Sequence, residues 1–214
     1  PATVWLRPRM AWRSEAQASH DHSRVLAQCF AGADHGPGAA GLTAQLEDRI
    51  WQEASSWKGY CEELARTAAA LGHGGCLRVL HELGGEAAAS LATANAKGRT
   101  PAHLAARQGH EGCLRELHEL GGAAAASLAA AAANGVTPAH FAAANGHEGC
   151  LRVLHELGGD AAASLAAADA DGDTSAHLAA AKGHEGCLRE LHELGGAAAA
   201  SLAAADADAA PVRV

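Results

Sequence analysis

Histidine and cysteine are the side chains of this 214-residue chain that offer the most chemistry. The 14 histidines and six cysteines are residue types that bind zinc and act in nucleophilic catalysis. Four of the cysteines recur every 37 residues with the same neighbours, at Cys76, Cys113, Cys150 and Cys187. A catalytic set occurs once and is asymmetric, whereas a thiol repeated in each unit is typical of a small buried hydrophobic group. We therefore expect no catalytic residues and no enzyme activity.

One cluster of possible metal ligands lies outside this pattern. His20, His22, Cys29 and His35 lie close together in the sequence, and residues 30–38 at the end of this stretch have the composition of a loop. The cluster lacks the paired Cys-x-x-Cys spacing of a zinc site, so we interpret it as part of a solvated tail, with zinc binding as the alternative. The chain also contains no phosphate-binding glycine loop and no hydrolase or protease motif. We expect no metal site and no cofactor.

The 37-residue interval extends beyond the cysteines and divides most of the chain into four units, which are 61–97, 98–134, 135–171 and 172–208. In the second unit, Thr100 and Pro101 are typical of a helix start and Gly109 of a helix end. A second helix follows, with a cysteine and three leucines at spacings of 1, 3 and 3, and it ends at Gly121. A helix pair this short cannot bury its own apolar face. The sequence therefore predicts an all-α solenoid of stacked helix-turn-helix units.

Three of these units resemble the ankyrin repeat. The motif Gly-x-Thr-Pro-Ala-His begins at Gly98 and at Gly135, and it recurs from Gly172 with Ser175 in place of proline. The first unit lacks the motif and resembles a degenerate N-terminal cap. The resemblance implies an ankyrin-type solenoid with short β-hairpin loops, motif histidines that bond to backbone, and a concave groove that binds other proteins.

The units depart from the ankyrin pattern in length and in core composition. Their period is 37 residues instead of 33, and the surplus falls in an alanine-rich stretch such as 161–164. Alanine is the strongest helix former, so an extra helical turn is predicted there. Histidine occupies positions 118, 155 and 192, where the family prefers leucine. We expect these histidines to thin the core and to leave the stability marginal.

The rest of the chain is assigned from composition and periodicity. Residues 1–41 are predicted to be a disordered N-terminal segment, 42–60 an amphipathic capping helix, 61–208 the repeats, and 209–214 a tail. The last unit keeps the apolar stripe of the internal units although no fifth unit covers it. A terminal repeat normally needs a polar outer face. We therefore expect possible self-association through this uncapped C-terminal repeat.

Charge and targeting signals limit the partners and the compartment. The net charge of −8 lies entirely in residues 61–214, which hold 10 basic and 18 acidic side chains. Binding to nucleic acid depends mainly on lysine and arginine, so a nucleic acid partner is not expected. The first residues lack the charged start and apolar core of a signal peptide, and no apolar run reaches the roughly 20 residues that span a membrane, so we expect neither a signal peptide nor a membrane-spanning segment. Cysteines held in helical register should stay reduced, which indicates an intracellular, cytoplasmic protein.

The units differ from one another mainly at hairpin tips and at the ends of the first helices. In proteins that resemble this one, these positions line the concave groove, although neutral drift after duplication would give the same pattern. Phe141 is the one aromatic residue of the repeats, and it is either a binding anchor or a filler of alanine-lined core space. The predicted partner-binding residues are Arg99, Arg107, Gln108, Val136, Phe141, Asn145, Asp173 and Lys182.

The sequence thus predicts a non-catalytic protein-protein interaction module, an ankyrin-repeat scaffold or adaptor whose partners are unidentified. The alternative is that the chain is a fragment of a larger enzyme or scaffold and serves as its regulatory or targeting arm.

Overall fold

The computed structural model describes residues 56–208, which form four successive groups of helices. The first group comprises α4 (Trp57–Leu71), α5 (Gly74–Leu83) and α6 (Gly85–Ala89), and the second comprises α7 (Pro101–Gln108), α8 (Glu111–Glu119) and α9 (Gly122–Ala126). The third comprises α10 (Pro138–Ala144), α11 (Glu148–Leu157), α12 (Gly159–Ala163) and the short 3-10 helix η1 (Ser164–Ala166), and the fourth comprises α13 (Ser175–Lys182), α14 (Glu185–Leu194) and α15 (Gly196–Asp208).

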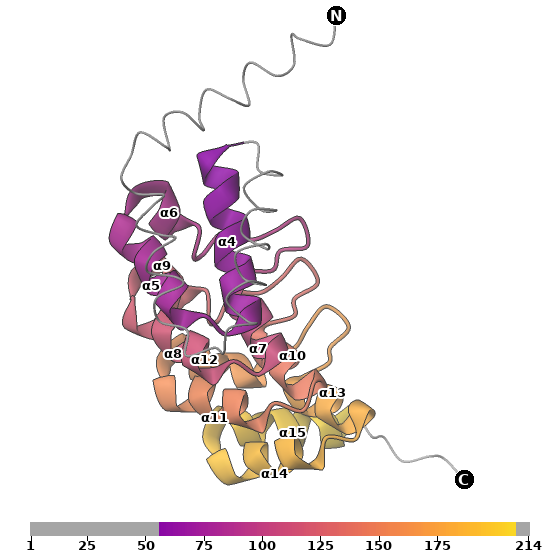
Figure 1. Ribbon diagram of the computed structural model, residues 1–214. Coiled ribbons are helices and arrows are strands. Elements are labelled where there is room, and N and C mark those ends of the chain that lie inside the picture. Colours follow the sequence, from indigo (N-terminus) through magenta and orange to yellow (C-terminus); the bar gives the residue numbers. More distant parts are fainter. Residues whose placement is uncertain (1–55, 209–214) are drawn as a thin grey trace, which may run out of the picture.

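The groups stack into a solenoid (Figure 1). The first helices of the groups pack on one another in the order α4, α7, α10 and α13, and the second helices in the order α5, α8, α11 and α14. Loops that join one group to the next project together from one side of the stack (Figure 1). Each group therefore buries its apolar face against its neighbours, as the prediction of an all-α solenoid requires.

A threonine and a histidine start the first helix of each complete repeat. Nδ1 of His103 accepts a hydrogen bond from the backbone N–H of Thr100 at 3.1 Å and lies 2.9 Å from the threonine hydroxyl oxygen. Thr137 with His140, and Thr174 with His177, form the same capping box. The first helical N–H groups need such partners because they have none within the helix.

The four surplus residues of the repeat form the predicted extra helical turn. They extend the second helix of each group into a third short helix, for example α9, which is followed by Leu128 with no exposed surface. Ser127 is also buried, and its hydroxyl donates to the carbonyl oxygen of Ala124 at 2.6 Å. The insertion is thus followed by a completely buried leucine in the first three repeats, which is Leu91, Leu128 or Leu165.

Alanine and leucine fill the core, and the unusual histidines of the second helices do not enter it. Leu114, Leu117 and Leu151 are completely buried among alanines of the first helices. His118 and His192 are exposed instead, while His155 is half-buried. The expectation that these histidines thin the core was wrong for His118 and His192, which face outward, whereas Nδ1 of His155 is buried without a hydrogen-bond partner among the described residues.

The N-terminal assignments are corrected at one boundary. Segment 1–41, most of the predicted capping helix and the tail 209–214 lie outside the described residues. Residues 57–60 belong to α4, which begins after the extended residue Ser56 and continues to Leu71. Tyr60 is completely buried and stacks on Trp57 with 5.5 Å between ring centres. These aromatic residues are therefore part of the first helix of the first repeat, and a boundary at residue 60 falls inside that helix.

The C-terminal repeat is covered by its own third helix. The 13-residue α15 packs against α13, α14 and η1. Of the apolar stripe expected to lie uncovered, Cys187 and Leu191 have 1% and 0% of their surface exposed, whereas Leu188 is half-buried. The hydroxyl of Thr174 donates to the carbonyl oxygen of Ser201 at 3.0 Å and ties α15 to the start of α13. The C-terminal repeat is thus covered over part of its apolar stripe, and self-association through it stays a prediction.

Candidate functional site

Three hairpin loops, residues 95–99, 132–136 and 169–173, form a row on one side of the stack. Each closes with a backbone hydrogen bond of 2.9 Å between its ends, such as that from the N–H of Asn95 to the carbonyl oxygen of Arg99. Neighbouring hairpins are joined as well, because the N–H of Ala133 donates to the carbonyl of Lys97 at 3.3 Å and the N–H of Ala170 to that of Asn134 at 3.0 Å. Within the described residues the only β-bridge is the isolated pair Ala168–Thr174. The row is thus continuous without forming a sheet.

Buried histidines hold this row against the first helices. Nε2 of His103 lies 3.1 Å from the carbonyl oxygen of Val136 in the next hairpin, and Nε2 of His140 lies 3.0 Å from that of Asp173. Burial lowers the pKa of His103 to about 4 and also lowers the pKa of His140. Both rings are therefore neutral near pH 7, with Nδ1 as acceptor and Nε2–H as donor. This is the backbone-bonding role that the resemblance implied.

Phe141 lies where the hairpins meet the first helices. Its ring is half-buried and meets His103 edge to face, with 5.9 Å between ring centres. The guanidinium carbon of Arg99 lies 4.8 Å from the centre of the same ring. The equivalent positions in the neighbouring repeats hold Leu104 and Leu178, both of which are also half-buried. The structure therefore brings Arg99 and Phe141 together across two repeats.

The other predicted partner-binding residues differ in accessibility. The side chains at the ends of the first helices are exposed, which are Arg107, Gln108, Asn145 and Lys182. Asp173 is half-buried. Val136 is buried, with 9% of its surface exposed. Its carbonyl oxygen is the hydrogen-bond partner of His103 Nε2. Val136 is thus a poor candidate for side-chain contact with a partner, because its side chain packs beneath the hairpin row.

Ion pairs join the second helices on the outer face of the stack, and sequence reasoning missed them. Arg78 forms two hydrogen bonds with the carboxylate of Glu116, and Arg152 does the same with Glu190. The second and fourth repeats have glutamate at this position, where the first and third have Val79 and Val153. Alternation with a period of two repeats was the signal that could have revealed these pairs.

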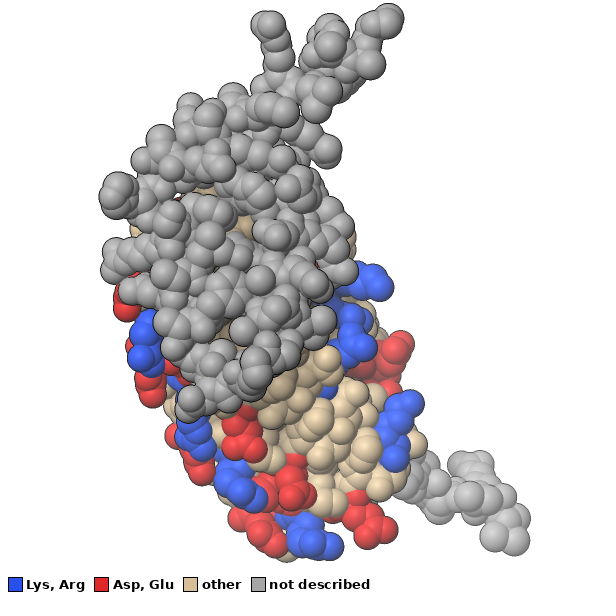
Figure 2. Space-filling view, in the orientation of Figure 1, with Lys and Arg blue, Asp and Glu red and all other residues tan. Residues whose placement is uncertain are grey.

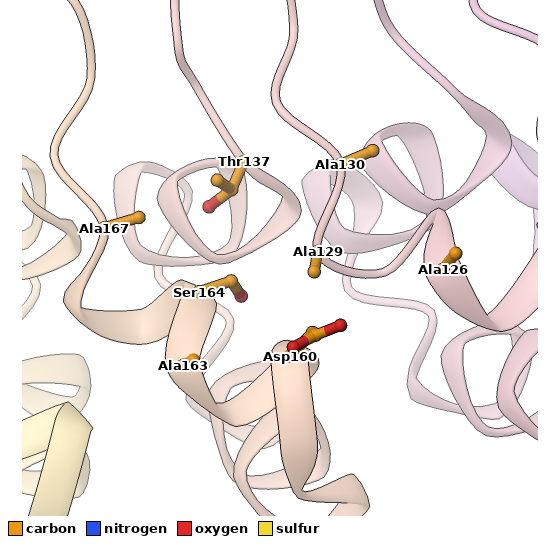
Figure 3. Close-up of a pocket in the computed structure, with 8 residues that line it drawn as sticks. All are labelled: Ala126, Ala129, Ala130, Thr137, Asp160, Ala163, Ser164 and Ala167. Atoms are coloured by element: carbon orange, nitrogen blue, oxygen red, sulfur yellow. The ribbon is translucent and has the colours of Figure 1, made fainter.

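A hollow of about 420 Å³ lies between α9 and α12 (Figure 3). Its lining consists of Ala126, Ala129, Ala130, Thr137, Asp160, Ala163, Ser164 and Ala167. The hydroxyl of Ser164 donates to the carbonyl of Ala161 at 2.7 Å, and the hydroxyl oxygen of Thr137 lies 2.8 Å from Nδ1 of His140. Asp160 is the one ionisable group of this lining, and both hydroxyl groups have the partners just described instead of this carboxylate. It also contains none of the predicted partner-binding residues.

The buried thiols and the remaining titratable groups offer no further site. Burial is the main cause that raises the pKa of Cys61, Cys113 and Cys150 to about 12 and that of Cys187 to about 11. A thiol with such a pKa is not a nucleophile at neutral pH. Between residues 56 and 208, no group of three or more histidine, cysteine or acidic side chains could hold a metal ion. The cluster from His20 to His35 lies outside that range.

Two family models match the chain. A model described as ankyrin repeats (3 copies) matches residues 120–201, and a model of the single ankyrin repeat matches residues 97–129. A search of curated proteins found no match to the sequence. None of the described helices combines the length and the apolar character that crossing a membrane requires.

Proposed function

Because residues 97–201 of the chain are ankyrin repeats, we propose that it is a non-catalytic adaptor whose first helices and hairpin loops bind another protein. Ankyrin repeats generally serve as protein-protein interaction modules. The raised pKa values of the buried Cys113 and Cys150 thiols support a function that does not use them as nucleophiles.

The position of Phe141 carries this proposal. An aromatic ring that is half exposed and already held by neighbours loses little conformational freedom when a partner covers it. Arg99 and His103 hold the Phe141 ring in this way. Aromatic residues and arginine are enriched among the residues that contribute most to binding energy. The exposed side chains at the ends of the first helices, Arg107, Asn145 and Lys182, supply the polar rim of such a surface.

Five cysteines among the described residues form no disulfide, which bears on where the protein acts. They are Cys61, Cys76, Cys113, Cys150 and Cys187, and all are buried. Cysteines outside disulfides are typical of reducing compartments. This supports the intracellular, cytoplasmic location that the sequence indicated.

Replacement of Phe141 by leucine tests the proposal, because the repeats on either side already have leucine there. A partner is first captured by the full chain and identified by mass spectrometry, and its affinity is then measured with purified proteins. We expect Phe141→Leu to weaken binding more than about fivefold, a loss of about 1 kcal/mol. The melting temperature should fall by no more than about 4 °C, because the substitution removes the contact with Arg99 and keeps an apolar side chain. Arg115→Ala on the outer face is the matched control and should bind normally. Equal affinity of the wild type and the Phe141→Leu variant would exclude Phe141 as the anchor.

A further inference from the structure

The three hairpins of the row differ in charge in a regular order. Residues 95–99 include two basic side chains, Lys97 and Arg99, and residues 132–136 include no charged side chain. Residues 169–173 include three aspartates. From the first hairpin to the last, the row therefore passes from positive through neutral to negative.

The charged groups lie on the outer side of the row. Lys97 and Asp171 at the tips are exposed, while Arg99 and Asp173 are half-buried. Asp169 has an internal role, because its Oδ1 accepts hydrogen bonds of 3.0 Å from the N–H groups of Asp171 and Asp173. In Figure 2, basic side chains lie above an acidic group on the edge from which the loops of Figure 1 project. Packed helices are about 10 Å apart, so the two charged ends are separated by about 20 Å.

We propose that this row of hairpins binds a second copy of the chain in an antiparallel arrangement. A two-fold axis through the neutral hairpin 132–136 places the basic hairpin of each copy against the acidic hairpin of the other. Both ends of the interface then pair opposite charges, whereas a parallel arrangement would oppose like charges. The order of charges is thus complementary to itself only when one copy is reversed. This inference goes beyond the proposed adaptor function, because it names a second copy of the chain as what the hairpin tips bind and does not need Phe141.

Sedimentation of the full chain tests the proposal. We expect a reversible dimer at about 50 mM salt that weakens at about 500 mM, because exposed charges are screened over a shorter distance. The variant Lys97→Glu/Arg99→Glu makes both ends negative, and Asp171→Lys/Asp173→Lys makes both ends positive. Each double variant should raise the dimer dissociation constant at least tenfold. Both keep Asp169, because its carboxylate accepts the backbone hydrogen bonds of hairpin 169–173. Circular dichroism melting checks that each variant folds, and Lys97→Glu alone keeps the contact between Arg99 and Phe141 intact.

Two further samples, a mixture of the double variants and the quadruple variant that combines their substitutions, separate this interface from other causes of self-association. A mixture of the two double variants should form heterodimers, because a negative row then meets a positive one. The quadruple variant reverses the order of charges and should again form homodimers. The proposal would be overturned by a wild type that stays monomeric at low salt. It would also be overturned by folded double variants that dimerise as the wild type does, or by a mixture and a quadruple variant that stay monomeric. Phe141→Leu should keep the dimer, so failure of the adaptor function and failure of this interface are distinguishable.

Discussion

Arg99 and Phe141 belong to different repeats, yet the guanidinium carbon of Arg99 lies 4.8 Å from the centre of the Phe141 ring. A cation over an aromatic face is attracted by the negative charge density of the ring. Leu104 and Leu178 occupy the ring position in the adjoining repeats, so this contact is absent at those positions. The junction between the second and third repeats therefore has a stabilising contact that depends on two variable residues.

Replacing Arg99 by alanine measures that contact. We expect Arg99→Ala to lower the free energy of unfolding by about 0.5–1 kcal/mol, the range for a partly exposed cation–π pair. Arg107→Ala, at the exposed end of α7, should change it by less than about 0.5 kcal/mol. Urea denaturation of both variants provides the comparison, and equal losses would show that stacking on Phe141 contributes nothing.

The buried histidines predict a loss of stability in mild acid. The folded-state pKa of His103 is about 4 and lies below its ordinary value of 6.5, and the pKa of His140 is lowered as well. Between about pH 6.5 and pH 4 the unfolded chain therefore binds more protons than the folded chain, so the free energy of unfolding falls as the pH falls. The shift at His103 alone corresponds to roughly 3 kcal/mol over this range. Melting temperatures from pH 7 to pH 5 should decline steadily.

An exposed histidine is the control for this pH dependence. His118→Gln removes a histidine on the surface of α8 and should leave the slope of stability against pH unchanged. His103→Gln should make the slope shallower, although it also lowers stability at pH 7. A slope that is the same in wild type and His103→Gln would mean that other groups cause the acid sensitivity.

Two equivalent glycines should respond differently to alanine. A methyl group at Gly149 would meet the carboxylate of Glu111 from the preceding repeat, whereas one at Gly112 would meet nothing within 4 Å. The difference arises because the first repeat has Gly74 where later repeats have glutamate. Gly112→Ala should raise the free energy of unfolding by up to about 1 kcal/mol through reduced backbone entropy of the unfolded chain. Gly149→Ala should gain less, because it displaces the Glu111 side chain, and equal gains in thermal denaturation would contradict this reasoning.

Local signals made much of each repeat predictable from the sequence. Thr100, Pro101 and Gly109 define one helix through capping and backbone conformation, and these effects involve only neighbours in the chain. The extra turn after the second helix was predictable for the same reason, because alanine favours helix wherever it lies. Position in the stack was harder to predict. Spacing alone did not place His118 on the outer face. The ankyrin family prefers leucine at this position, and a leucine there would continue the apolar stripe of the second helix.

Contacts between repeats account for what the sequence did not reveal. The stacking of Arg99 on Phe141 and the burial of Val136 depend on how one hairpin rests on the next, which a single-repeat pattern does not contain. The cover that α15 provides over Cys187 was missed because its sequence matches the shorter third helices of the internal repeats. Arg99 and Phe141 lie about one repeat apart, and a local pattern carries no information at that distance. Cys187 and α15 belong to the same repeat, but how they pack likewise depends on the fold and not on local sequence.

The alternation of glutamate and valine along the second helices leads to the last prediction. The side chain of Glu190 is only 9% exposed and forms hydrogen bonds at both oxygens with Arg152, whereas Arg115 and Glu156 are about half exposed and share one bond of 2.8 Å. Arg152→Ala leaves a nearly buried carboxylate without its partner and should destabilise more than Arg115→Ala, whose loss should stay below about 1 kcal/mol.

Addition of Glu190→Val to the Arg152→Ala variant should recover stability. Valine is the natural residue at this position in the first and third repeats, where Val79 and Val153 are buried, and it leaves no unpaired charge in the interface. The midpoint of urea denaturation should therefore be lowest for Arg152→Ala and higher for the double variant. If the double variant is as unstable as Arg152→Ala, the cost lies in lost packing of the arginine stem and not in the unpaired carboxylate.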